Sequence, residues 1–286
     1  MAAPQLAPFD TAARPSIASN IVRMEKMLVP VDFSEPCLRV VRHASKFARY
    51  FGSEVTVLHV QPATENSARE RLESFGQVIL EGLSVRRVLL RSSDPASSIV
   101  EVAHRDRVGM IFMPTYGASP FRKLILGSVT EKILQQVNWP VCTGVHLDER
   151  MRFDRKPIRK IVCAVDRDSH ARSVLAWVRD FAGTLGAAVT VVHAITALPD
   201  LGRNSWSLQL RRDGEAAVKR QLHELAIRAD LHVETGEVTP VVMAALGNTD
   251  ADLLVIGRST RSDPFGPIVT NSYSLIRHSN CPVISV

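Results

Sequence analysis

The chain has 286 residues, 45% of them hydrophobic, and a formal net charge of +6. This length predicts two domains, and the apolar content is enough for two buried cores, which excludes a disordered chain. No apolar run approaches the roughly 18 residues of a membrane helix, and the basic residues are scattered, so neither a membrane nor a nucleic acid is an expected partner.

The N-terminal segment, residues 1–22, contains three prolines and no compact apolar stretch, which predicts a flexible tail and not a signal peptide. Behind it, residues 23–146 read as a first domain. Helical spacing of apolar residues from Cys37 to Phe51, after Ser34-Glu35-Pro36, predicts a helix with a polar cap and proline in its first turn. Short β-branched runs predict buried strands at 28–31, 54–60, 85–90, 110–113 and 141–145.

The charged segment 147–157 lacks an apolar period and predicts a linker, followed by a second domain at 158–286. Strands are expected there at 161–165, 188–193, 233–238, 253–256 and 283–286. A long helix is expected from about Ser205 to Ala229, with a core stripe of Val218, Leu222, Leu225 and Ala226. Alternating strands and helices predict an α/β fold, with two tandem Rossmann-like or flavodoxin-like domains, each a five-stranded parallel sheet covered on both faces.

The two halves repeat the same landmarks in the same order, which indicates a duplicated domain. The first strand of each half ends in an aspartate, Asp32 or Asp166, and the second in a histidine, His59 or His193. Each half closes on a Pro-Val strand. Four widely spaced cysteines, without a metal-binding spacing, predict buried free thiols in a reducing cytoplasm.

Ligands of open parallel sheets bind beyond the carboxyl ends of the strands, where the strand order reverses. Asp32 and Asp166 are expected there, where a carboxylate can accept hydrogen bonds from a ribose or an adenine amino group, or can cap the following helix. A stronger signal runs from Met113 through a basic loop to Gly127-Ser128 at the start of an apolar-periodic helix. Glycine and helix-start amides make an anion site there, and Ser128 can cap the helix or bond a phosphate.

These motifs resemble the universal stress protein family, as a tandem member. Nucleotide-binding members carry Gly-x2-Gly-x9-Gly-Ser/Thr after the fourth strand; Gly117, Gly127 and Ser128 match it, and Pro114 replaces the first glycine. Pro30-Val31-Asp32 matches the first-strand motif, and Val60 the adenine-contacting valine. The resemblance implies ATP or AMP binding, with Mg²⁺ if ATP, in a cytoplasmic stress-response protein. The implied site residues are Pro30, Val31, Asp32, Val60, Met113, Gly117, Gly127, Ser128, Val129 and Thr130.

The second half departs further from the family pattern. Gly257 matches the first glycine, but Thr260 stands at the second, and Val269-Thr270 stand in place of Gly-Ser. Ala164 and Ala194 replace the proline and the valine. We therefore expect the first domain to hold any nucleotide and the second to hold none.

Catalysis finds little support in the sequence. Asp166-Arg167-Asp168 resembles the nucleophile motif of haloacid-dehalogenase-type phosphotransferases, but no acidic pair follows the later strands. His59 and His193 could be bases, although a structural hydrogen bond is favoured. We expect at most weak ATP hydrolysis, and either a nucleotide-responsive interaction module or a scaffold that binds no nucleotide. The last strands of the two domains are expected to pair as an intramolecular pseudo-dimer, and a homodimer of the whole chain is left open.

Overall fold

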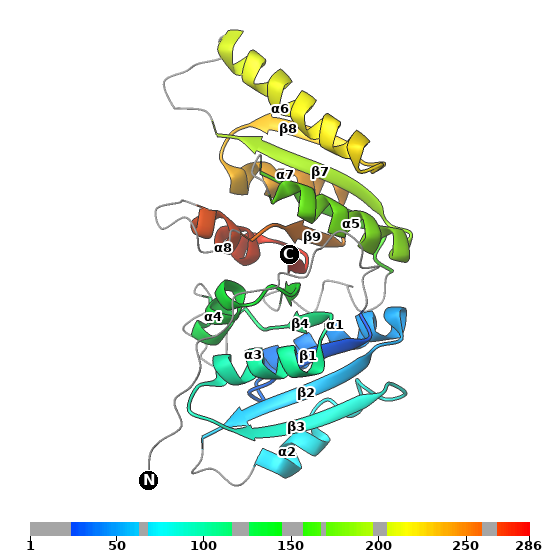
Figure 1. Ribbon diagram of the computed structural model, residues 1–286, viewed down its shortest axis with the longest axis vertical. Helices are drawn as coiled ribbons and strands as arrows, with labels where there is room; N and C mark the ends of the chain where they lie inside the picture. The colour runs from blue at the N-terminus through cyan, green and yellow to red at the C-terminus, as the bar shows by residue number, and fades with distance from the viewer. Residues whose placement is uncertain are drawn as a thin grey trace.

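The computed structural model describes residues 24–62, 68–115, 126–144, 157–166, 170–196, 205–258 and 268–286. The expected N-terminal tail and all but Pro157 of the expected linker lie outside these residues. Within them, strands and helices alternate in both halves (Figure 1). This alternation confirms the predicted α/β fold.

In the first domain the strands are β1 Lys26–Pro30, β2 Glu54–Gln61, β3 Val85–Arg91, β4 Met110–Phe112 and β5 Val141–Thr143. The helices are α1 Glu35–Phe51, α2 Ala68–Ser74, α3 Pro95–Asp106 and α4 Ser128–Gln136. In the second domain the strands are β6 Lys160–Ala164, β7 Ala188–Ile195, β8 Asp230–Thr235, β9 Leu253–Ile256 and β10 Val283–Ser285. Its helices are α5 Ala171–Leu185, α6 Ser205–Glu224, α7 Val238–Thr249 and α8 Ile268–His278.

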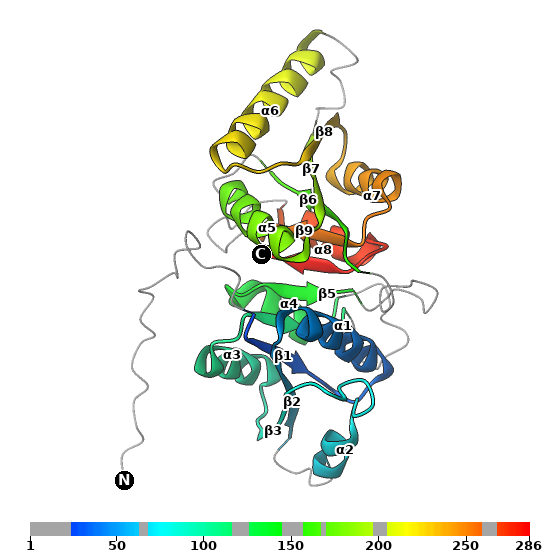
Figure 2. The same ribbon diagram turned by 90° about the vertical axis from the view of Figure 1, so that its right-hand side faces the viewer.

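All ten strands form one sheet, in the order β3-β2-β1-β4-β5-β10-β9-β6-β7-β8. Neighbouring strands are parallel within each domain. Among the strands of the described residues, the one antiparallel pair joins the domains: β5 runs against β10 (Figure 2). In this pair Ile284 lies opposite Cys142. The predicted pairing of the two last strands is therefore confirmed.

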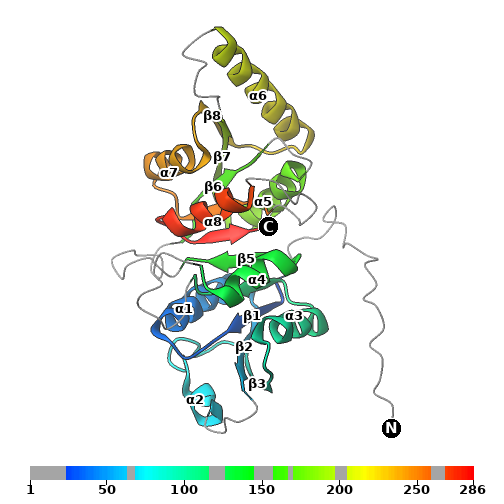
Figure 3. The same cartoon turned by 90° about the vertical axis from the view of Figure 1, so that its left-hand side faces the viewer.

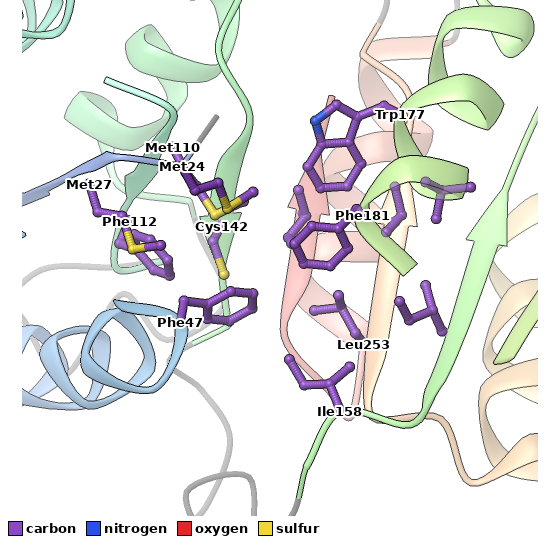
Figure 4. Packing of buried hydrophobic residues seen from close by; sticks show 14 of the residues in the cluster. Met24, Met27, Phe47, Met110, Phe112, Cys142, Ile158, Trp177, Phe181 and Leu253 are labelled. Carbon is purple, nitrogen blue, oxygen red and sulfur yellow. The ribbon is translucent and has the colours of Figure 1, made fainter. Parts of the chain in front are cut away.

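Two apolar layers cover the sheet, and each extends across both domains. One layer packs α1, α2, α5 and α6 against one face, and the other packs α3, α4, α7 and α8 against the opposite face. Figure 3 shows α4 of the first domain and α8 of the second near the strands that join the domains. The first layer crosses the domain junction through stacked aromatic rings, since Phe181 lies 6.0 Å from Phe47 and 5.7 Å from Phe51 between ring centroids (Figure 4). The two domains thus share core packing as well as strand hydrogen bonds.

The helix α1 shows how local sequence sets an element. Ser34 occupies the N-cap position and Pro36 the first turn, as predicted, but the Ser34 side chain makes no capping hydrogen bond. The apolar stripe from Cys37 to Ala48 is buried. Gly52, with φ of 65°, ends the helix in the left-handed conformation that glycine adopts without steric cost.

Two predicted boundaries in the second domain were wrong. The strand expected at 233–238 is β8, Asp230–Thr235, because Gly236 breaks the extended chain and Val238 already begins α7. The long helix ends at Glu224, and Ala226 follows it with φ of 51°. Val218, Leu222 and Leu225 are buried, whereas Ala226 is exposed and does not belong to the core stripe.

The junction between the domains depends on one glycine. Gly144 follows β5 with φ of 144°, and a Cβ atom there would lie 2.7 Å from the Cα atom of Pro282. Real Cβ atoms do not approach a backbone atom so closely. The two chains therefore come together next to β5 and β10 only because residue 144 has no side chain.

Candidate functional site

The strand order reverses between β1 and β4 in the first domain and between β6 and β9 in the second. The carboxyl ends of these strand pairs are where an open α/β sheet binds ligands. Asp32 follows β1, and Asp166 follows β6 at the equivalent place. Both aspartates are exposed.

Asp32 closes the turn between β1 and α1. Its Oδ1 accepts hydrogen bonds from the Ser34 backbone N–H at 2.9 Å and from the Cys37 thiol at 3.0 Å. Burial pushes the pKa of Asp32 upward, but the hydrogen bonds from Ser34 and Cys37 outweigh it and hold the pKa below its usual value. The carboxylate is therefore ionised at neutral pH. Both of these geometrically defined hydrogen bonds go to Oδ1.

The start of α4 lies beside β4. Gly127 is the N-cap residue, and its backbone N–H donates to the Thr115 carbonyl at 2.8 Å. Ser128 is the first helical residue and is exposed. Thr130 is buried, and its hydroxyl donates to the Pro114 carbonyl at 2.7 Å. The first-turn amides of a helix have no partner within the helix, so this turn offers N–H groups to an anion while Thr130 holds it against the strand end.

The other predicted site residues line the same edge of the sheet with different exposure. Pro30, Val31 and Met113 are buried, and Val60 and Val129 are half-buried. Gly117 lies outside the described residues. The Thr115 hydroxyl is buried and, within the described parts of the chain, has no hydrogen-bond partner. An unsatisfied polar group next to the start of α4 fits a site that a polar ligand completes.

The two histidines make equivalent structural hydrogen bonds. Nδ1 of His59 lies 2.7 Å from the Val31 carbonyl oxygen, and Nδ1 of His193 lies 3.0 Å from that of Val165. Each bond requires the proton on Nδ1, because the carbonyl can only accept. The prediction of a structural role is confirmed, and the bond ties the second strand of each domain to the end of the first.

The second domain contains a cavity of about 220 Å³ at its own switch point. Its polar lining residues include Asp166, His170, Thr196, Arg258, Asn271 and Ser272. Its apolar walls come from the ends of β6, β7 and β9 and from helices α5, α7 and α8. The cavity occupies the domain in which the sequence predicted no nucleotide.

The sequence contains a signal for this cavity, which is a set of residues smaller than their counterparts in the first half. Ala164, Ala194 and Gly257 line it, at the positions where the first half carries Pro30, Val60 and Pro114. Each replacement removes side-chain volume, so together they open space. The backbone correspondence holds here, since the Ser272 hydroxyl donates to the Gly257 carbonyl at 3.4 Å just as Thr130 donates to Pro114.

The described residues include no group of three or more His, Cys, Asp or Glu side chains that could hold a metal ion. None of the helices they form is long and apolar enough to cross a membrane. All four cysteines are buried and free, as predicted. Of the motif Asp166-Arg167-Asp168, only Asp166 lies within the described residues.

A tandem pair of open α/β domains, each with a candidate site at the carboxyl ends of its strands, is the class of protein that this fold defines. The model of the universal stress protein family matches residues 24–143 and again residues 157–286. The chain therefore belongs to the universal stress protein family, as a two-domain member.

Known relatives match one domain or both. A universal stress protein of Methanocaldococcus jannaschii is 28% identical over 149 residues, which cover 44% of this chain and 87% of the relative. A solved structure of a putative universal stress protein from Pseudomonas aeruginosa has a TM-score of 0.67 and 19% identity, covering 93% of this chain and 94% of that chain. One from Archaeoglobus fulgidus has a TM-score of 0.66 and 21% identity, covering 93% and 97%. These two show the fold of the whole tandem chain.

A shorter universal stress protein of Archaeoglobus fulgidus was solved in complex with dAMP. It is 25% identical, with a TM-score of 0.35, and covers 46% of this chain and 98% of its own.

Proposed function

We propose that this chain is a cytoplasmic stress-response protein whose first domain binds an adenine nucleotide, ATP or AMP, and acts as a nucleotide-responsive interaction module. The observation that supports it is the juxtaposition at the β1–β4 switch point. The ionised and exposed carboxylate of Asp32 follows one strand, and the first turn of α4 follows its neighbour. These are the two kinds of group that a nucleoside phosphate requires.

Five of the predicted residues have a direct role in this proposal. Asp32 accepts a hydrogen bond from a ribose hydroxyl or the adenine amino group, and Val60 provides an apolar wall for the base. The backbone amides of Ser128 and Val129 hold the phosphates, and the absent side chain of Gly127 leaves room for them. If ATP is the ligand, Mg²⁺ binds through its phosphate oxygens.

Pro114 and Thr130 limit the phosphate-binding contacts. Pro114 has no N–H to donate, and the Thr130 hydroxyl proton is already given to the Pro114 carbonyl. The phosphate group therefore depends on the first turn of α4 and on the Thr115 hydroxyl. The proposal assigns nucleotide binding and no chemical step, since no general base is assigned beyond the aspartate.

Calorimetric titration of the full chain with ATP, AMP and dAMP tests the proposal, and we expect one site per chain. Gly127→Val should abolish binding, because a branched side chain fills the phosphate space. Ser128→Ala keeps the backbone amide and removes only the hydroxyl, so it should cost less, about 0.5–1.5 kcal/mol. Mass spectrometry of ligand released from freshly purified protein would identify the nucleotide bound in the cell.

A matched pair of variants decides between the domains. Asp32→Ala should weaken binding, and Asp166→Ala, the same change at the equivalent position, should not. The reverse result would place the ligand in the second-domain cavity. No binding of any of the three nucleotides would favour the alternative function, a scaffold that acts through its surface alone.

A further inference from the structure

Arg258 belongs to the second domain but donates hydrogen bonds to the first. It follows β9, and its backbone N–H donates to the Val286 carbonyl at 3.0 Å. Its side chain reaches across the junction: Nη1 donates to the Leu134 carbonyl at 3.4 Å, and Nη2 donates to the Trp139 carbonyl. The guanidinium thus joins the wall of the second-domain cavity to the first domain.

The two acceptors lie at the C-terminal end of α4. Leu134 is in the last turn of this helix, which ends at Gln136, and Trp139 is in the segment that follows. The last carbonyls of a helix have no partner within it, and a cation placed there also interacts favourably with the helix dipole. A side chain of one domain therefore provides the C-terminal cap of a helix in the other.

This contact is asymmetric although the domains are repeats. The residue equivalent to Arg258 in the first domain is Thr115, since each follows the strand end by the same spacing and the hydrogen bonds of Thr130 and Ser272 correspond. A threonine side chain is too short to reach across to α8. Among the described residues, the second domain therefore makes this contact with the first, and the first domain makes no equivalent one.

The guanidinium of Arg258 bonds neutral groups and lines a cavity. Among the described residues, no carboxylate lies within ion-pair distance of its guanidinium, which bonds neutral carbonyls. The cavity of about 220 Å³ beside it provides space into which the side chain can turn. Its contacts with the first domain are therefore two hydrogen bonds, one to α4 and one to the segment that follows it.

We propose that Arg258 is a positioning residue through which the second domain sets the anion affinity of the first. α4 is a single helix of nine residues, so the placement of its C-terminal end also sets the placement of its N-terminal turn. Gly127 fixes the N-terminal end to Thr115, and Arg258 fixes the other end. The part of this proposal that concerns nucleotide affinity rests on the proposed function above.

The test compares two interdomain contacts of α4 in the full chain. Arg258→Met removes the cap and keeps most of the side-chain volume. Tyr273→Phe, the control, removes the hydrogen bond that Gln135 Nε2 donates to the Tyr273 hydroxyl at 3.0 Å between α4 and α8, and leaves the cap intact (Figure 1). Hydrogen exchange of the α4 amides should become about tenfold faster in Arg258→Met and change less than about twofold in Tyr273→Phe. Arg258→Lys, which keeps the charge but not the planar fork, should be intermediate.

Calorimetry with AMP provides a second readout, and Arg258→Met should weaken AMP binding about fivefold. If the wild-type chain binds none of ATP, AMP and dAMP, the proposed function fails, while the exchange of α4 still decides whether Arg258 positions the helix. Equal exchange in Arg258→Met and Tyr273→Phe would mean a general loosening of the junction and would overturn the inference. Unchanged AMP affinity in a variant with faster α4 exchange would overturn the link between the helix and its ligand.

Discussion

Replacing Gly144 by alanine tests how tightly the two domains are joined. The new Cβ atom would lie 2.7 Å from Pro282 Cα, and the backbone φ of 144° is a conformation that alanine rarely adopts. Backbone strain of this kind costs about 1–3 kcal/mol, and overpacking costs about 1–3 kcal/mol more. After partial relaxation of both chains we expect a loss of about 3 kcal/mol in the free energy of unfolding.

The control is Gly186→Ala. Gly186 also has a positive φ, 63°, but a Cβ atom there meets nothing within 4 Å. Only the left-handed backbone penalty applies, about 1–2 kcal/mol. Urea denaturation followed by circular dichroism gives both values, and hydrogen exchange of β5 and β10 locates the damage. Equal losses in the two variants would refute the argument, because they would show that Pro282 moves aside without cost.

Three further predictions concern the junction and the site. Residues 22–150 and 156–286, expressed separately, should self-associate or aggregate, because each exposes its last strand. Two stable monomers that do not associate on mixing, measured by light scattering, would contradict this. The pKa of Asp32 is lowered in the folded protein, so this residue stabilises the fold above its unfolded pKa of about 3.9, and the stabilisation is lost as the pH falls through its folded pKa. As the pH is lowered from about 5 to about 3, the denaturation midpoint of Asp32→Asn should therefore fall less steeply than that of the wild type. Thr130→Val should cost about 1 kcal/mol by removing the bond to the Pro114 carbonyl, and a wild-type midpoint would count against that bond.

The sequence predicted the elements that local patterns determine. Buried strands such as β2 and β9 appear as continuous β-branched runs, and the repeated landmarks located both domains. β8 was misplaced because Val233 and Val238 both read as strand residues, while Gly236 between them marked the break. The glycine spacing predicted a site in the first domain. The cavity of the second domain is indicated instead by Ala164 and Ala194, whose side chains are smaller than their counterparts in the first domain.

The contact between Arg258 and α4 could not be predicted, because it depends on how one domain is placed against the other. Arg258 follows Gly257 in a segment that reads as a degenerate phosphate loop. Its acceptors are backbone carbonyls, which carry no side-chain signature. Sequence patterns predict contacts within one repeat, whereas Arg258 makes its contacts between the two repeats.

The antiparallel joint of β5 and β10 also bears on how such a chain evolves. When two identical subunits meet through the same strand, every substitution occurs in both subunits. A long cationic side chain that forms a favourable contact from one subunit must then also be accommodated in the other. Fusion of the two copies into a single chain removes that constraint. One copy can then hold threonine at position 115 while the other acquires arginine at position 258. Within one chain the two halves can therefore differ at equivalent positions, while the sheet that they share keeps them together.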